Sequence, residues 1–573
     1  MKKLKSYMLI AGVTLSVSSL FAQRQDSLLR RQMELEREFN PTLQDANKIN
    51  SLPALQQPTI KKANTDYSTW AGRTTPPLEI ALSQPGNAMT EIPYDKKRGY
   101  IGLGAGNNAN IDGIFGYRII DEKANKLNFT FMHNSSNSNV EYVQDSDPAK
   151  NKACRMDNLG RLAYDRLSDA YKLNIGASYL HSLFNYYGNT FGNTRIFNDE
   201  NQGLSVFGLN AGLQSVDNED FNYKALIDYK NFSTKYGAVL SDKGLAGNRF
   251  EAIVGLEKPF EDYDSRIGID GQVLGLFNDV PSSSDYEDFF LLKGTPYIRF
   301  KGDNWDAKLG ANIIFKFADK DRIHFTPNVN LSLNITDRSS LYANIGGGVD
   351  DNGYLNVMEE SRYLQPMTYV KPSFSILDMD LGAKIGEADG FRFDIFGGFK
   401  KTGDEHFLLF EQTANLSAYT NQEYLHPYYA DMTRSYIGGR MLCNVWSPLE
   451  ISLGLKKNFY TVKGLSINDA EISDAKAYNQ PGFEADIRAT IDVIANLKFT
   501  LNYCFAGDRW SYFNRENLKM DNINDLNLGA VYRFTDWLSI NAKANNLLFS
   551  KYDLWYGFPV QGFNAMGGVS IKF

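Results

Sequence analysis

The sequence of 573 residues predicts an all-β protein, a transmembrane antiparallel β-barrel of about 22 strands behind a Pro-rich N-terminal extension. Three observations predict this fold. Apolar and polar residues alternate along most of the chain, long and short connections alternate between the expected strands, and the last strand ends on an aromatic residue. Together they favour a sheet that closes on itself in a membrane over a soluble sandwich.

Alternation with a period of two dominates from Tyr100 onward. Successive side chains of a strand point to opposite faces, so each expected strand has one apolar and one polar face. The apolar face meets lipid in a membrane barrel but forms the core in a sandwich, and alternation alone does not separate the two. The apolar positions are clearest at Tyr171, Leu173, Ile175, Ala177 and Tyr179; Ile267, Ile269 and Val273; Phe391, Phe393, Ile395 and Phe399; Leu526, Leu528, Ala530, Tyr532 and Phe534; Leu538, Ile540, Ala542 and Ala544.

The connections separate these two folds. Short turns alternate with long polar segments, as periplasmic turns alternate with external loops in an outer-membrane barrel. An even strand number then places both chain ends in the periplasm. The expected short turns are 166–170, 260–262, 302–304, 337–339, 387–390, 447–450, 495–497 and 535–537, and the expected long loops are 136–155, 188–201, 233–248, 277–290, 350–373, 405–431, 461–478, 508–523 and 549–562. Two external connections, near 107–110 and 318–322, are short.

The terminal strand, residues 563–573, carries Val569, Ile571 and Phe573 on one face and Gly568, Ser570 and Lys572 on the other. A barrel closes with such a strand, which is apolar only toward lipid. The barrel-insertion machinery is thought to recognise a terminal Phe, and we expect Phe573 to be its contact.

The N-terminal residues divide into two segments. Residues 1–22 have a basic start, an apolar run and a small-residue cleavage site before Gln23, as secretory signal peptides do. Residues 23–95 hold seven of the 18 prolines, a density that prevents ladder pairing and favours extended structure. We expect a periplasmic or lumen-filling extension there, followed by the barrel over residues 96–573.

Composition limits the other classes. The chain is 43% hydrophobic and 13% aromatic, and no apolar stretch after Ala22 is long enough for a spanning helix. The net charge of −7 comes without a basic stripe, so we expect no nucleic-acid partner. The three cysteines, Cys154, Cys443 and Cys504, show neither a disulfide framework nor a metal spacing.

A family resemblance is found near the C-terminus. The run Ala544-Asn545-Asn546-Leu547-Leu548-Phe549-Ser550-Lys551-Tyr552, the element Tyr556-Gly557-Phe558-Pro559 and the strand ending in Phe573 resemble the end of TonB-dependent receptors. The resemblance implies a 22-stranded barrel with an N-terminal plug. Residues 23–95 are too short and Pro-rich for that plug, and no TonB box is evident. The expectation is therefore a barrel of this type without its plug.

The sequence predicts no catalytic, cofactor or metal site. His133, His181, His324, His406 and His426 are scattered without a paired-ligand spacing. Of these, His133 and His406 lie near external strand ends.

Two further patterns have structural interpretations that outweigh the functional ones. The run Gly102-x-Gly104-x-Gly106 lies in a strand and favours close packing over phosphate binding. Asp350, Asn352, Gly353 and Glu359 have calcium-loop spacing, but Gly348 occupies the first ligand position, so a solvated acidic loop is preferred.

Aromatic clusters stand at the strand–loop borders. We interpret them as an interfacial girdle in preference to a sugar-stacking platform, because rings with a polar tip favour the membrane interface. The clusters are Trp510, Tyr512 and Phe513; Tyr186 and Tyr187; Trp555, Tyr556 and Phe558.

Two functions remain open for a barrel in the Gram-negative outer membrane. It transports a solute or forms a channel, or it is a non-transporting scaffold whose extension or loops bind a surface lipoprotein or a periplasmic partner. A wide barrel left empty would leak, so we expect residues 53–93 to lie in or against its periplasmic mouth. The alternative is that external loops such as 350–373 and 405–431 fold inward.

Overall fold

The computed structural model describes residues 97–143, 150–188, 200–216, 221–237, 243–260, 263–279, 288–317, 322–365, 368, 370–388, 390–410, 424–446, 448–467 and 469–573. The predicted signal peptide and extension, residues 1–95, lie outside the described residues.

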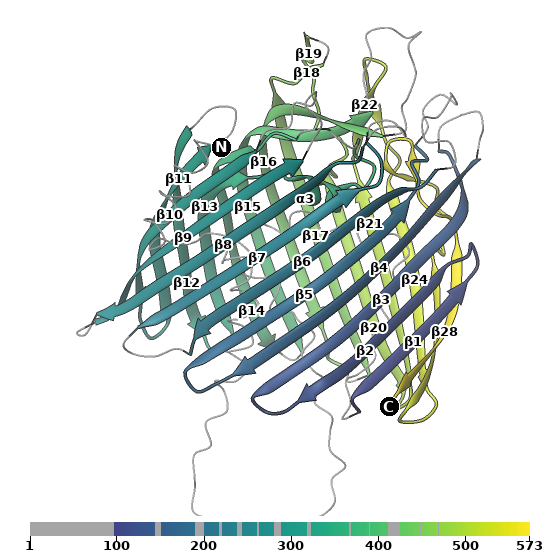
Figure 1. The fold of residues 1–573 in the computed structure, drawn as a ribbon, viewed down its shortest axis with the longest axis horizontal. Coiled ribbons are helices and arrows are strands. Elements are labelled where there is room, and N and C mark those ends of the chain that lie inside the picture. Colours follow the sequence, from purple (N-terminus) through teal and green to yellow (C-terminus); the bar gives the residue numbers. More distant parts are fainter. Residues whose placement is uncertain are drawn as a thin grey trace, which may run out of the picture.

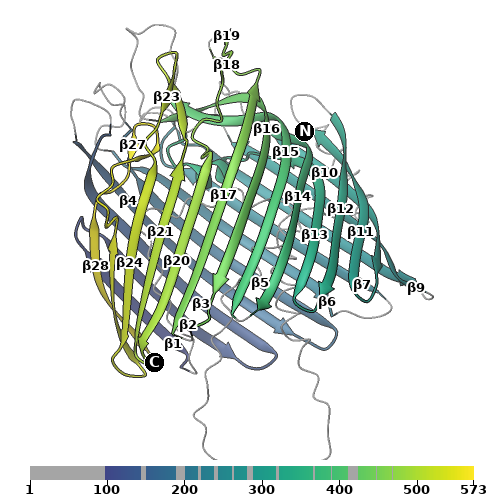
Figure 2. The same ribbon diagram turned by 180° about the vertical axis from the view of Figure 1, so that it is seen from behind.

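One closed sheet of 22 strands forms the wall of the molecule (Figures 1 and 2). Its strands are β1 (Gly99–Gly106), β2 (Ile111–Asp121), β3 (Asn125–Glu141), β4 (Lys150–Leu167), β5 (Tyr171–Phe184), β6 (Gln202–Ser215), β7 (Asn222–Thr234), β8 (Ala246–Phe260), β9 (Tyr263–Asp279), β10 (Phe289–Lys301), β11 (Trp305–Phe317), β12 (Arg322–Thr336), β13 (Ser339–Asp350), β14 (Ser373–Ala388), β15 (Phe391–Phe410), β16 (Leu425–Cys443), β17 (Leu449–Lys463), β20 (Phe483–Ile494), β21 (Leu497–Gly507), β24 (Ile523–Arg533), β25 (Leu538–Asn545) and β28 (Asn564–Lys572).

The connections carry the remaining described elements. These are the short hairpins β18 (Ser466–Ile467) with β19 (Ala470–Glu471), β22 (Trp510–Phe513) with β23 (Glu516–Lys519), and β26 (Asp553–Trp555) with β27 (Phe558–Pro559), and the helix α3 (Tyr354–Glu360).

Each barrel strand pairs antiparallel with the next one along the chain, and β28 returns to pair with β1. The backbone of Gly99 and Phe573 exchanges two hydrogen bonds at this seam, of 2.7 and 2.8 Å. The expected strand number and the closing role of the last strand are confirmed. A barrel closed in this way leaves no edge strand unpaired.

Glycines allow close packing at the seam. A Cβ added to Gly102 would lie 2.8 Å from Cγ2 of Ile114 on β2, and one on Gly106 would lie 2.4 Å from the carbonyl oxygen of Ala565. Gly102 and Gly106 of the run Gly102-x-Gly104-x-Gly106 therefore serve close strand packing, as the sequence predicts, whereas a Cβ on Gly104 would meet only ordinary contacts, the nearest at 3.7 Å.

The two faces of the wall differ as the alternation predicts. Outward residues are exposed large hydrophobics, including Ile175, Ile267 and Ile395. Their strand neighbours on the inner face are polar and buried, for example Asp270 and Gln272. The outward apolar band is the surface that a transmembrane barrel presents to lipid.

The two ends of the barrel are unlike. Turns of a few residues join the strands at one end, and the long connections and their hairpins gather at the other (Figures 1 and 2). Trp305, Trp446 and Trp537 lie at short turns and are exposed by 44%, 59% and 48%, which suits an interfacial belt at the short-turn end.

No helix among the described residues has the length and apolar character needed to span a membrane. Cys154, Cys443 and Cys504 are all free thiols.

Candidate functional site: a segment that closes the barrel

The connection between β13 and β14 folds into the barrel. We call residues 351–372 the inward segment; residues 366, 367 and 369 of it lie outside the described part. Its helix α3 buries Tyr354, Leu355, Val357 and Met358. This is the inward fold of loop 350–373 that the sequence leaves open as an alternative.

The inward segment begins on a fixed turn. The Oδ1 of Asp351 accepts hydrogen bonds from the backbone N–H of Gly353 at 3.0 Å and from Nδ2 of Asn356 at 2.5 Å. Its Oδ2 lies 3.4 Å from Nε of Arg249 on β8. These contacts satisfy both carboxylate oxygens and aim the chain toward the lumen.

The segment then contacts strands that lie far from β13 and β14 around the ring. Phe232 of β7 stacks on Tyr354 with ring centroids 5.5 Å apart, and Arg362 reaches Asp157 of β4. Along the ring of 22 paired strands, β4 lies ten strands away from β14. The largest possible separation in such a ring is eleven strands.

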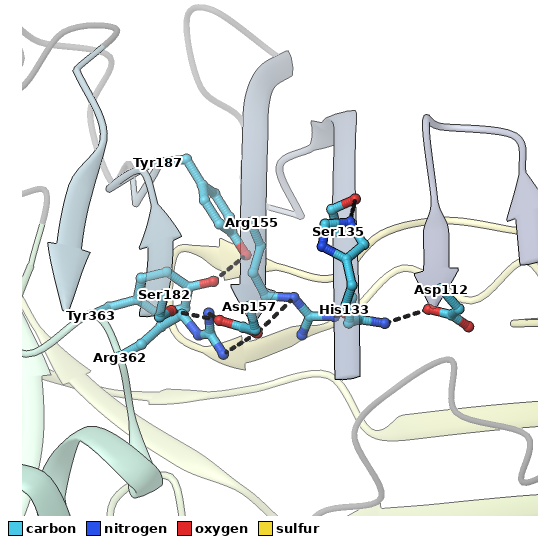
Figure 3. A network of polar contacts seen from close by, with 10 residues as sticks. Asp112, His133, Ser135, Arg155, Asp157, Ser182, Tyr187, Arg362 and Tyr363 are labelled. Atoms are coloured by element: carbon cyan, nitrogen blue, oxygen red, sulfur yellow. Dashed lines mark hydrogen bonds and ion pairs between the residues drawn. The ribbon is translucent and has the colours of Figure 1, made fainter. Parts of the chain in front are cut away.

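An ion cluster holds the far end of the segment (Figure 3). Nη1 and Nη2 of Arg362 lie 3.3 and 3.4 Å from the two carboxylate oxygens of Asp157. Arg155 brings its Nε to 3.6 Å from the same carboxylate, and Ser182 donates its hydroxyl to it at 2.5 Å. Two guanidinium groups thus share one acid between the wall and the segment.

An aromatic stack lies beside that cluster. The ring of Tyr363 stacks on Phe558 with centroids 4.2 Å apart, and its hydroxyl donates to Oη of Tyr187 at 3.2 Å. Tyr187 in turn donates to the carbonyl of Pro559 at 3.0 Å. Burial, with Tyr363 alongside, holds the pKa of Tyr187 well above its ordinary value, so this hydroxyl stays a neutral donor.

Two residues beyond Arg362, the segment joins the end of the β15–β16 hairpin. Leu364 forms a parallel bridge with Leu425: the Leu425 N–H donates to the Tyr363 carbonyl at 2.8 Å, and the Gln365 N–H donates to the Leu425 carbonyl at 3.0 Å. His406 of β15 lies 2.7 Å from a carboxylate oxygen of Glu360. The segment is therefore tied both to β4 and to the β15–β16 hairpin.

Buried apolar residues surround the segment in one cluster, which we call the apolar layer. It lies at the long-connection end of the barrel. Its buried members are Val140, Phe184, Tyr186, Tyr187, Leu204, Phe232, Leu245, Tyr354, Leu355, Val357, Met358, Leu364, Val370, Leu408, Phe410, Tyr424, Leu425, Phe513 and Phe558.

The predicted aromatic girdle is wrong for these residues. Tyr186 and Phe558 have no exposed surface and Tyr187 only 7%, because they pack in the apolar layer and not against lipid. Tyr512 and Phe513 are also buried. Alternation locates residues at the end of a strand, but it does not tell whether a loop covers them.

A cavity of about 1330 Å³ lies against the segment. Residues 356–363 line one side of it, and residues of many strands line the rest, including the charged Arg155, Asp228, Arg249 and Lys400. Both signs of charge are present.

The other candidate residues of the sequence do not converge. His133 contacts Asn158 and Ser135, and the five histidines lie on five different strands. Asp350 pairs with Lys400, and Asn352 donates to the Lys371 carbonyl and to Ser373. Among the described residues no group of three His, Cys, Asp or Glu could hold a metal ion.

One sequence signal could have indicated the inward segment. Tyr354, Leu355, Val357 and Met358 repeat with helical spacing inside a connection that otherwise looks polar. An apolar helical face in a loop requires a buried partner, and the apolar layer provides it here.

No protein-family model matches the chain, and no curated protein matches its sequence. Among solved structures, the chain is similar to the barrels of outer-membrane receptors. Against the ferric enterobactin receptor from Pseudomonas aeruginosa the TM-score is 0.60 at 11% identity, over 84% of this chain and 81% of that chain. Against the pyoverdine outer membrane receptor from the same organism it is 0.58 at 13%, over 84% and 79%.

The siderophore receptor PirA from Acinetobacter baumannii gives a TM-score of 0.58 at 11% identity, over 84% of this chain and 81% of that chain. At such identities the likeness concerns the fold alone. The predicted resemblance to the TonB-dependent receptor barrel is confirmed at that level.

Proposed function

We propose that this protein carries a solute across the Gram-negative outer membrane through its barrel, and that the inward segment is the gate. The proposal takes the long-connection end as external and the short-turn end as periplasmic, because this is the arrangement of outer-membrane barrels. Both chain termini then lie in the periplasm.

One observation carries the proposal. The inward segment crosses the lumen on contacts that are separable, namely an ion cluster, one parallel bridge and stacked rings, and it covers a cavity large enough for a solute. A permanently sealed scaffold has no need of a hollow interior. A gate needs both a closed state and a space behind it.

The structural neighbours support the class of function. They are receptors for ferric enterobactin and for pyoverdine. From these neighbours we infer for this chain only that a solute passes through the barrel, and we do not infer which solute.

The N-terminal extension and the partners complete the proposal. Residues 23–95 would fill or contact the periplasmic mouth, below the inward segment. The Phe573 strand would be the contact of the barrel-insertion machinery, lipid would cover the outward face, and a surface lipoprotein or a periplasmic protein would supply the signal for opening.

Planar-bilayer recording of the purified full chain tests this function. We expect a mostly closed barrel with brief large openings, and a continuously open pore when residues 354–363 are replaced by a Gly-Ser linker of equal length. If the linker variant conducts and the native chain never opens, the barrel is a scaffold and the gating proposal fails.

A further inference from the structure

Arg434 on β16 is a buried cation without an anion. Its side chain lines the cavity, and the residue is only 9% exposed. Within the described part of the chain its Nε has no hydrogen-bond partner, and no ion pair forms with it. Its guanidinium lies over the face of Tyr436, 5.6 Å from the ring centroid.

Other buried lumen cations are paired. Lys456 lies 3.4 Å from a carboxylate oxygen of Glu484, Lys400 lies 3.7 Å from one of Asp350, and Arg249 has acids at 2.9 and 3.4 Å. Desolvating a guanidinium is costly unless an anion and hydrogen bonds compensate for it. Arg434 therefore differs from these three cations, because no acid in the described part of the chain compensates its charge.

The neighbours of Arg434 add to its positive field. Lys400 is its direct cross-strand partner on β15. Lys456 of β17 lies 5.4 Å from the same Tyr436 ring that Arg434 contacts. Three cations thus lie near one another on the wall. Two of them, Lys400 and Lys456, are paired with acids.

The shape of the site fits a solute group. A guanidinium offers a planar fork of donors that matches carboxylate and phosphate oxygens. The cavity of about 1330 Å³ exceeds what a small organic ligand occupies, so a group bound at Arg434 need not fill it. Tyr460, the partner of Arg434 on β17, is held by a hydrogen bond to the Pro481 carbonyl and leaves the guanidinium accessible from the cavity.

We infer that Arg434, flanked by Lys400 and Lys456, is a binding subsite in the lumen for an anionic group, a carboxylate or a phosphate, of the solute that passes the gate. This inference rests on the proposed function and adds the chemical class of the solute. The oxygen atoms of the bound anionic group pair with the guanidinium of Arg434, which has no acid partner on the described wall.

Isothermal titration of the detergent-purified full chain tests the subsite, with citrate and inorganic phosphate as anionic probes, spermidine as the cationic probe and maltose as the neutral one. We expect the anions to bind with an affinity that falls with added salt. Arg434→Gln should weaken that binding about 10- to 100-fold, as loss of charge-assisted hydrogen bonds does. Arg434→Lys should keep the charge but recover only part of the affinity, because the fork is lost.

The matched control is Arg161→Gln, the same charge change at an exposed residue that lines the same cavity. It should change anion affinity by less than about twofold. All variants must keep heat-modifiable migration in SDS, which reports a folded barrel. Absence of anion binding by the native chain, or equal losses at Arg434 and Arg161, would overturn the subsite. If the chain shows bilayer openings but binds no anion, the subsite proposal fails and the gating proposal stands.

Discussion

Arg362→Gln is the most informative perturbation of the gate. Arg362 is the residue of the inward segment that reaches farthest around the ring, and it contacts Asp157 on β4 and the face of Phe184 at 5.6 Å. Gln keeps much of the length but removes the charge. The change acts on the closed state alone, because an open gate separates Arg362 from β4.

The size of the effect follows from exposure. The side chains of Arg362 and Asp157 are 24% and 25% exposed, so their pairing lies between a solvated and a buried ion pair. Arg155, with Nε 3.6 Å from Asp157, still compensates the acid after the substitution. We therefore expect a loss of about 1–2 kcal/mol from the closed state, which raises the open-to-closed ratio about 5- to 30-fold.

The assay is the open probability of single barrels in a planar bilayer, measured at fixed salt and voltage. The single-channel conductance should not change, since the substitution leaves the barrel wall unaltered. Arg161→Gln, away from the inward segment, should leave the open probability within about twofold of native. Asp157→Asn combined with Arg362→Gln should be less than additive, because both remove the same pair.

An unchanged open probability in Arg362→Gln would refute the latch role of the ion cluster. So would an equal rise in Arg161→Gln, since the effect would then come from lumen charge in general.

Three further predictions concern the wall, the stack and the extension. Ile175→Arg should impair assembly, because Ile175 is 47% exposed on the outward face and Arg at mid-bilayer costs about 2–4 kcal/mol. Asn174→Arg, at the neighbouring position on the other face of the same strand, should insert normally, and equal heat-modifiable yields would reject the face assignment. Phe558→Ala removes a fully buried ring that stacks on Tyr363. It should raise the open probability more than Arg362→Gln does, because such truncations cost about 3–5 kcal/mol. An open probability equal to that of the native chain would show that the stack is not part of the gate. Deleting residues 24–92 should leave membrane insertion intact. The deletion should raise conductance and sensitivity to large antibiotics chiefly when it is combined with Arg362→Gln. An equally large rise from the deletion alone would show that the extension, and not the inward segment, closes the barrel.

The barrel could be predicted because its constraints are local and repeated. Ile175, Ile267 and Ile395 alternate with polar neighbours, since each strand has a lipid face and an inner face. The terminal Phe573 strand and the regular change of connection length gave the closure and the strand number.

The gate could not be predicted in the same way. Contacts such as Arg362 with Asp157 join residues 205 positions apart, and no periodicity encodes them. Tyr187 and Phe558 are aromatic at a strand border, which fits a lipid girdle and a buried stack equally well until the inward segment is placed. The unpaired state of Arg434 likewise depends on which acids the fold brings near it.

Locking the inward segment tests the central claim most directly. Leu364 and Leu425 form a parallel bridge, which puts their Cα atoms about 5 Å apart and within disulfide range. Leu364→Cys with Leu425→Cys, in a chain whose Cys154, Cys443 and Cys504 are changed to Ser, should show no bilayer openings when oxidised and regain them on reduction. Equal opening in the oxidised and reduced barrel would contradict the account, because solute would then pass without movement of the segment.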